Sequence, residues 1–191
     1  MSSIVLIPAY KPDLRLVSLV QNLSNVNQLK ILVVNNGNIK DFDPYFEKIL
    51  KFKNVSVMKI KNNFGKGYGL KKGLYYIIDN FENIDNIIFA DADGQHIEKD
   101  IISIRQRIET EKHDNIFLIG NRLHNNLTPY KNLFANKFFN YFFKKKLNLN
   151  IQDSLCGLRA IKFNYAKYIA ELKYNDFRFE VEMIIYLKKN H

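Results

Sequence analysis

Five short apolar runs recur along the chain, each about the length of a β-strand and each followed by polar residues. They are IVLI at 4–7, ILVV at 31–34, VSVMKI at 55–60, IIFA at 87–90 and FLIG at 117–120. Between some of these runs, apolar residues recur at helical spacing, from Leu14 to Leu23 and from Leu70 to Phe81. Because strands that alternate with helices pair in parallel and are covered on both faces, the pattern predicts an α/β fold with a mostly parallel central sheet.

The second half of the chain is less regular. We expect helices at 131–146, 162–172 and 178–190 and a short strand near 157–161. The 191 residues, of which 47% are hydrophobic, fit one domain over 1–191, because no repeat or low-complexity linker divides them. The helical pattern runs to the end of the sequence at IIYLKKNH, so truncation at the C-terminus is one interpretation.

Composition narrows the functional classes. Cys156 is the only cysteine and the four histidines are scattered, so we expect neither a disulfide nor a zinc centre. The first strand pattern begins at Ile4 with no basic region before it, which predicts no signal peptide and a cytoplasmic location. The sequence contains no apolar run long enough to span a bilayer. The formal net charge of +10 favours a polyanionic partner: a nucleotide, a diphosphate, a nucleic acid or an anionic membrane surface.

The fourth apolar run leads directly into two acids, in NIIFADADGQHIEKDI. A strand buried on both faces would place Asp91 and Asp93 at the carboxyl edge of the sheet, where ligands of open α/β sheets bind. Neighbouring carboxylates repel unless a cation compensates, and Mg²⁺ or Mn²⁺ uses such ligands. The sequence therefore predicts a divalent metal site. The alternative is a solvated turn that caps a helix from about Glu98.

Two more polar segments follow predicted strands. In PAYKPD, Pro12 and Asp13 favour a helix start whose amides would face a phosphate. In VVNNGN, Asn35 and Asn36 are candidates for hydrogen bonds to a nucleobase, and a plain Asn-Gly turn is the alternative.

A glycine-rich segment, NNFGKGYGLKKG, follows the third strand. Gly65 and Gly67 permit a tight loop, Lys66 is placed to meet a diphosphate, and a helix begins directly afterwards. The spacing of the glycines matches neither a Walker loop nor a dinucleotide fingerprint, so those two nucleotide-binding motifs are excluded.

The order of the motifs is more specific than any one of them. The succession IPAYKPD, VVNNG, NFGKGYGLKKGL, DADGQH, IGNR, QDSLCGLRAI and FRFEVEMI resembles family 2 glycosyltransferases of the GT-A fold. It is most similar to the polyprenyl-phosphate sugar synthases, which include dolichyl-phosphate mannose and glucose synthases. The resemblance covers residues 4–187, and DADGQH together with DSLCGLRA is its most specific part.

The resemblance implies inverting transfer of a sugar from a nucleotide donor, with Mg²⁺ or Mn²⁺ held by Asp91, Asp93 and Gln95. Asn36 falls where the family has an aspartate that contacts the base, which leaves UDP-, GDP- and dTDP-sugars open as donors. The residues expected to bind the nucleotide-sugar are Pro8, Ala9, Tyr10, Asn36, Gly65, Lys66, Asp91 and Ala92.

On the acceptor side, the resemblance matches Asp153 in QDS to an acid that orients the acceptor or acts as base, so Asp153 and Asp93 are the expected catalytic residues. A turn cap before Ser154 is the alternative for Asp153. Glu180 and Glu182 are second choices, and Glu182 is expected to face solvent or to pair with Arg178.

Two basic residues are expected to bind the acceptor. Arg122 in IGNR would clamp an acceptor phosphate, and Lys131 stands where relatives tend to carry an arginine. We expect His96 and Cys156 to be structural.

The segment NKFFNYFFKKKLNL has two interpretations. Its aromatic and basic residues suit a helix in a membrane interface. The alternative is a core-facing stripe of Phe138, Tyr141 and Phe142, with Phe139 and Phe143 left to face lipid, and we favour this stripe.

The resulting hypothesis is a metal-dependent glycosyltransferase that uses a polyprenyl phosphate acceptor, with peripheral contact to the cytoplasmic face of a membrane. Transfer to a growing cell-surface glycan is the alternative reaction, and a non-catalytic nucleotide-sugar binder is the alternative class. A nucleic-acid partner is not expected, because it would explain the charge but not the acids at the sheet edge.

Overall fold

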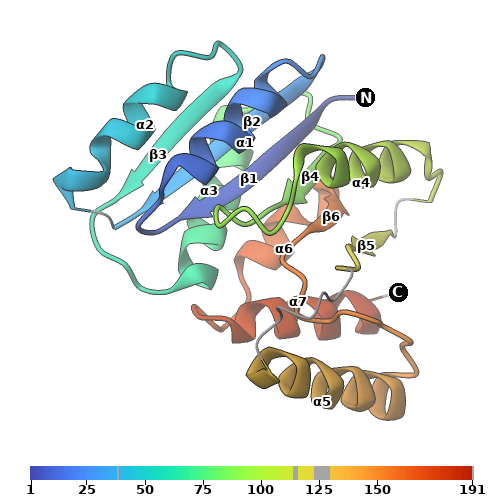
Figure 1. The fold of residues 1–191 in the computed structure, drawn as a ribbon. Helices are drawn as coiled ribbons and strands as arrows, with labels where there is room; N and C mark the ends of the chain where they lie inside the picture. Colours follow the sequence, from blue (N-terminus) through green and yellow to red (C-terminus); the bar gives the residue numbers. More distant parts are fainter. Residues whose placement is uncertain (38, 114–115, 123–129, 191) are drawn as a thin grey trace.

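The structure is a computed structural model that describes residues 1–37, 39–113, 116–122 and 130–190, and of residues 130–135 it describes only the backbone. The described strands form one six-stranded sheet in the order β3-β2-β1-β4-β6-β5 (Figure 1). Their bounds are β1 Ser3–Ala9, β2 Leu29–Asn36, β3 Val55–Ile60, β4 Asn86–Phe89, β5 Phe117–Ile119 and β6 Arg159–Lys162.

The strands β1 to β4 pair in parallel, and β6 runs antiparallel to both of its neighbours, β4 and β5. The predicted α/β fold with a mostly parallel sheet is therefore confirmed. The continuous apolar runs correspond to strands that are buried on both faces, since every residue of β4 is buried and Ile4 to Ile7 of β1 have no exposed surface.

Helices follow most strands. Their bounds are α1 Leu14–Ser24, α2 Asp43–Ile49, α3 Lys66–Asn80, α4 Glu98–Thr110, α5 Tyr130–Leu147, α6 Ala166–Ala170 and α7 Arg178–Lys189, with short 3-10 turns η1 Lys40–Phe42 and η2 Phe163–Tyr165. The helices predicted at 131–146 and 178–190 correspond to α5 and α7. The helix predicted at 162–172 is divided between η2 and α6. None of the helices in the described ranges is long and apolar enough to cross a bilayer.

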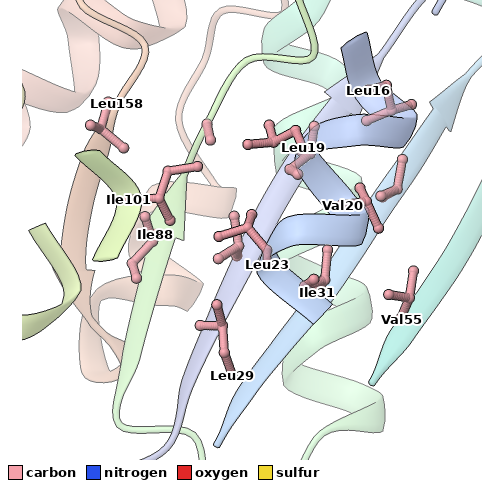
Figure 2. Packing of buried hydrophobic residues seen from close by; sticks show 14 of the residues in the cluster. Leu16, Leu19, Val20, Leu23, Leu29, Ile31, Val55, Ile88, Ile101 and Leu158 are labelled. Atoms are coloured by element: carbon pink, nitrogen blue, oxygen red, sulfur yellow. The ribbon is translucent and has the colours of Figure 1, made fainter. Parts of the chain in front are cut away.

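The core has two layers, one on each face of the sheet. Helices α1, α2 and α4 cover one face, and α3, α6 and α7 contribute to the layer on the other (Figure 1). Figure 2 shows the apolar side of α1 turned toward the strands, with its labelled residues Leu16, Leu19, Val20 and Leu23. This apolar side is the helical face that the sequence pattern predicts.

Glycines let α3 approach its neighbours closely. A Cβ on Gly67 would lie 2.6 Å from the Cβ of Phe179 in α7, and a Cβ on Gly73 would overlap Leu6 in β1. Gly65, which precedes the helix, has φ of +107°, a conformation that side chains disfavour. The glycine-rich segment therefore serves helix packing as well as the loop that the sequence predicts.

The inward face of α5 differs from the expected one. Phe143 is fully buried, whereas Phe138 and Tyr141 are 59% and 63% exposed, so the predicted core-facing stripe is wrong. Amides make the inward contacts instead. Asn136 donates to the Asp153 carboxylate, and Asn140 donates to the Gln152 carbonyl and accepts from the backbone N–H of Ser154. Asn136, Asn140 and Phe143 are spaced as i, i+4 and i+7 and lie on the same face of the helix. Because two of these three inward residues are polar, a search for apolar residues at helical spacing does not identify the buried face.

Candidate active site

A cleft of about 840 Å³ opens at the carboxyl ends of β1, β2 and β4, between the first turns of α3 and α7. It gathers most of the residues predicted to bind a nucleotide-sugar: Pro8, Tyr10, Asn36, Gly65, Lys66, Asp91 and Ala92. The side chain of Ala9 instead lies in the hydrophobic core. Polar segments that are far apart in the sequence therefore meet at one edge of the sheet, as expected for parallel strands.

The acids and the amide of DADGQH all line the cleft. The Asp93 carboxylate accepts from the backbone N–H of Gln95 at 3.0 Å and from its Nε2 at 2.7 Å. The Oε1 atom of Gln95 accepts from Nη1 of Arg122 at 2.6 Å. Asp93, Gln95 and Arg122 thus form a continuous hydrogen-bonded row that leads from two residues of the cleft lining, Asp93 and Gln95, to Arg122.

The Lys66 ammonium sits between two carboxylates. Its Nζ lies 2.6 Å from Oδ1 of Asp91 and 3.0 Å from Oε1 of Glu180. Burial disfavours the charged ammonium, but the Glu180 and Asp91 carboxylates outweigh it and raise the pKa of Lys66. Lys66 therefore carries a full positive charge inside the cleft.

Asp91 is enclosed on several sides. Burial opposes its ionisation, but Lys66 and His96 hold the pKa of the Asp91 carboxyl well below its usual range. His96 is itself buried, with Nε2 at 3.8 Å from Oδ2 of Asp91. A Cβ on Gly157 would overlap the Asp91 carboxylate, so the glycine of DSLCGLRA leaves room for this acid.

Gly157→Ala is expected to weaken metal-dependent nucleotide binding about tenfold, the usual cost of displacing one charged contact. The added methyl group requires the Asp91 carboxylate to move away from its present place. The φ angle of Gly157 is outside the range that favours glycine, so the backbone accepts alanine. Calorimetric titration with UDP and Mn²⁺ measures the effect.

Gly120→Ala is the matched control, because its methyl group would crowd Leu158 and Cys156 but not Asp91. Equal losses in the two variants would attribute the effect to general crowding and contradict the role given to Gly157.

Asn36, the residue predicted to contact a nucleobase, lines the cleft. It ends β2 and is 2% exposed, so Asn35 and Asn36 belong to the strand and the turn begins at Gly37. Its Nδ2 donates to the Gly65 carbonyl at 3.1 Å. Its Oδ1 has no hydrogen-bond partner within the described ranges, although buried acceptors are normally paired. A ligand N–H would satisfy this oxygen.

The helix starts offer less to a phosphate than the sequence predicts. The backbone N–H of Arg15 in α1 donates to the Asp13 carboxylate at 2.8 Å, and that of Tyr68 in α3 donates to the Asn175 carbonyl at 2.8 Å. Protein acceptors thus occupy one first-turn amide in each helix, and the lining of the cleft also includes the Lys66 ammonium.

The Asp153 carboxylate is buried in an ion pair. It is 1% exposed and accepts from Nε and Nη2 of Arg122 at 2.7 and 3.0 Å, and from Nδ2 of Asn136 at 2.9 Å. The Asp153 carboxylate in turn raises the pKa of Arg122. Asp153 lines a second cavity of about 480 Å³ rather than the main cleft. The side chain of Lys131, the other predicted acceptor residue, lies outside the described residues.

The two candidate glutamates of FRFEVE differ in position. Glu180 is buried and lines the cleft. Glu182 accepts from the backbone N–H groups of Lys173 and Tyr174 at 3.1 and 3.0 Å. The predicted pair between Glu182 and Arg178 is wrong, because Arg178 binds Asp176 at 2.7 Å, only two residues away.

Arg159 is a buried residue that supports the site from behind and that the sequence-based predictions do not include. It is 1% exposed and donates to the carbonyls of Cys156 at 2.9 Å and Ser154 at 3.0 Å, and to that of Glu180. Its hydrogen bonds therefore connect the loop after Asp153 to α7. The sequence signal for Arg159 is an arginine within an apolar strand segment, GLRAI, since such an arginine must be buried and must bind acceptors.

Burial raises the pKa of the Cys156 thiol to about 11, which agrees with a structural role.

The donor set of the cleft fits a hard divalent cation. Asp91, Asp93 and Gln95 offer carboxylate and amide oxygens, the ligands that Mg²⁺ and Mn²⁺ prefer, with substrate phosphates completing the shell. Two of these ligands already have a cation against them, since Asp91 contacts the Lys66 ammonium and the Gln95 oxygen accepts from the Arg122 guanidinium. In the described part of the chain, no group of three histidine, cysteine or acidic residues is preassembled to hold a metal. The set therefore suits a metal that arrives together with phosphate oxygens.

A mostly parallel sheet with acids, an amide and a lysine at its carboxyl edge places this protein in the class of GT-A folds, which solved structures share. The chain matches the model of glycosyl transferase family 2 over residues 4–169, and it belongs to that family. The resemblance drawn from the sequence motifs is thereby confirmed.

Two relatives carry names that include an acceptor. The UDP-N-acetylglucosamine--dolichyl-phosphate N-acetylglucosaminyltransferase of Methanococcus voltae is 28% identical, over 97% of this chain and 80% of the relative. The dolichyl-phosphate beta-glucosyltransferase of Dictyostelium discoideum is 25% identical, over 97% of this chain and 62% of the relative. The chain thus spans less than two thirds of the second relative.

Solved structures share the fold. Glucosyl-3-phosphoglycerate synthase from Mycobacterium tuberculosis, in complex with phosphoglyceric acid, has a TM-score of 0.73 at 14% identity, over 99% of this chain and 66% of that one. The same enzyme in complex with Mn²⁺, UDP-glucose and phosphoglyceric acid has a TM-score of 0.68 at 15% identity, over 99% of this chain and 65% of that one. At this identity the likeness establishes the GT-A fold.

Proposed function

We propose that this chain transfers a sugar from a nucleotide-sugar to a polyprenyl phosphate, with inversion at the anomeric carbon and with Mg²⁺ or Mn²⁺ as cofactor. One observation carries the proposal: a single cleft combines an unpaired acceptor oxygen on Asn36, a partly buried ammonium on Lys66 and the oxygen ligands of DADGQH. Each of these features meets a different part of a nucleotide-sugar.

The donor lies along the cleft from base to sugar. The Asn36 oxygen accepts an N–H from uracil, thymine or guanine, and Lys66 pairs with the diphosphate. Asp91, Asp93 and Gln95 would hold the divalent cation. When bound, the cation supplies charge neutralisation of the diphosphate. The Lys66 ammonium adds to this stabilisation because it lies in a partly buried site, where charges interact strongly.

Transfer is a single displacement at the anomeric carbon. A phosphate oxygen of the acceptor forms the new bond on one face of the sugar, while the bond to the β-phosphate oxygen breaks on the other. The electron pair of that bond leaves with the nucleoside diphosphate. The anomeric configuration is therefore inverted.

The acceptor side supports a phosphate more than a neutral hydroxyl. Arg122 reaches both the Gln95 end of the cleft and Asp153, so its guanidinium borders the place where the sugar would lie. A phosphate monoester has a second pKa of about 6 and arrives largely ionised, so it needs little proton abstraction. Asp153 is held by Arg122 and would have to leave this pair to accept a proton from a glycan hydroxyl. The names of the two relatives point to the same acceptor class.

Peripheral contact with the cytoplasmic face of a membrane accompanies this proposal. The exposed side of α5 carries Phe138 and Tyr141, and its last turn carries Lys144, Lys145 and Lys146. Aromatic and basic side chains of this kind suit a membrane interface that contains anionic lipids.

A binding screen followed by a transfer assay tests the function. Saturation with one of UDP, GDP or dTDP at about 100 times its Kd is expected to stabilise the protein by about 2.7 kcal/mol, and only with Mn²⁺ present. The matching nucleotide-sugar should then label a short-chain polyprenyl phosphate but not the corresponding polyprenol.

If the nucleotide stabilises the protein equally in excess chelator, the proposed metal dependence is contradicted. Equal labelling of the phosphate and the alcohol would overturn the proposed acceptor.

A further inference from the structure

Lys66 shares its charge between carboxylates from two different elements. Asp91 follows β4 and Glu180 lies in the first turn of α7, and both are within 3.0 Å of the same Nζ. The three side chains are between 10% and 19% exposed, so water screens them little. Glu180 has no part in the mechanism described above.

The two partners of Lys66 differ in function, because Asp91 is a proposed metal ligand and Glu180 is not. Asp91 belongs to the proposed metal ligand set, and a divalent cation held by its carboxylate would repel the Lys66 ammonium, which lies 2.6 Å from Oδ1. Lys66 must therefore move off Asp91 when the cation binds. Glu180 keeps a second carboxylate against the ammonium, so the lysine has a partner at both stages.

The position of Glu180 is fixed by its surroundings. Arg159, which is buried, donates to the Glu180 carbonyl, and the side chain of Glu180 is 10% exposed. The neighbouring residue, Phe179, lies against Gly67 in the first turn of α3, so the helix starts that carry Lys66 and Glu180 are in direct contact. Glu180 is therefore held at a set distance from the base of the lysine side chain.

We propose that Glu180 is a positioning residue, which draws the Lys66 ammonium away from Asp91 and holds it beside the diphosphate when the metal binds. This inference rests on the proposed function. In the free protein, the Lys66 ammonium competes with the metal for the Asp91 carboxylate. Glu180 weakens that competition because it also binds the ammonium. The metal and the nucleoside diphosphate therefore bind more tightly together than either does alone.

Binding of Mn²⁺ alone, followed by electron paramagnetic resonance, tests the inference without any turnover. Glu180→Gln leaves Lys66 on Asp91 only, so the affinity for Mn²⁺ is expected to fall about tenfold, the effect of one charge at this range. Lys66→Met removes the competing cation, and the affinity for Mn²⁺ is expected to rise by a similar factor. In the Lys66→Met background, Glu180→Gln should change the affinity by less than about twofold, because the coupling runs through the lysine.

Glu182→Gln is the matched control, since it removes the same charge from the same helix at a residue bound to the backbone of 173–174. It should leave the affinity for Mn²⁺ unchanged. Equal losses from Glu180→Gln with and without Lys66 would show a direct effect of charge on the metal and would overturn the inference.

A second measurement applies if Lys66→Met does not fold. Glu180→Gln is expected to lower the affinity for UDP in Mn²⁺ about tenfold and to leave the affinity for uridine unchanged, because only the diphosphate meets Lys66. Equal losses for UDP and uridine would overturn the inference. A wild-type protein that binds no Mn²⁺ would overturn the proposed function and this inference together, whereas normal binding in every Glu180 variant would overturn this inference alone.

Discussion

Asp91→Asn is expected to lower the rate of sugar transfer about a hundredfold or more, because it removes an anionic ligand of the metal and one of the two partners of Lys66. The change keeps the size of the side chain, and Lys66 retains Glu180 as a partner, so the fold should persist. The measurement is the transfer rate with saturating nucleotide-sugar and Mn²⁺, together with the unfolding midpoint.

Asp85→Asn provides the control at the opposite end of the same strand. Asp85 is exposed and accepts from the backbone N–H of Ser2 at 2.7 Å, far from the cleft edge of the sheet. The Asp85 variant should transfer sugar at the wild-type rate. An Asp91→Asn protein with wild-type turnover would refute the metal site, as would wild-type turnover in excess chelator.

Arg122→Ala is expected to destabilise the protein by about 3 kcal/mol, because it leaves the buried Asp153 carboxylate without its guanidinium. For a chain of this size, that loss corresponds to a fall of roughly 6–12 °C in the melting temperature. Urea unfolding monitored by circular dichroism gives the free energy directly.

A second substitution separates the buried charge from other effects. If the uncompensated carboxylate causes the loss, Asp153→Asn in the Arg122→Ala background should restore most of the stability. A double variant that is less stable than Arg122→Ala would show that the other contacts of the Asp153 carboxylate contribute more to stability than its pair with Arg122. In the single variants, loss of polyprenyl phosphate binding with Arg122→Ala and retained activity with Asp153→Asn would favour a phosphate acceptor over a hydroxyl.

The fold and the place of the site follow from patterns that are local in the sequence. Apolar runs of four to six residues identify β1 to β4, and the polar residues directly after them fall at the carboxyl edge because parallel strands all end there. Asn36, Lys66, Asp91, Asp93 and Gln95 are brought into one cleft by this rule alone.

The partners of the charged residues could not be predicted in the same way. Lys66 binds Glu180 and Arg122 binds Asp153 across long sequence separations, and no spacing rule covers contacts between separate elements. At short range, the helical i,i+4 rule failed for Arg178, because Asp176 captures the guanidinium before the helix begins. The buried face of α5 was missed because Asn136 and Asn140 bind backbone and carboxylate groups there, and amides do not register as buried in a hydrophobic pattern.

The link between Lys66 and Glu180 also has a consequence for biosynthesis, since 114 residues separate them. A ribosome that adds about 5–20 residues per second needs roughly 6–23 s to travel from the lysine codon to the glutamate codon. By the end of that interval all four parallel strands have been synthesised in order, but α7, which forms one wall of the cleft, is not yet complete. The residues that follow the parallel strands are therefore synthesised well before α7, and the wall of the cleft that α7 forms is the last part of the cleft to be made.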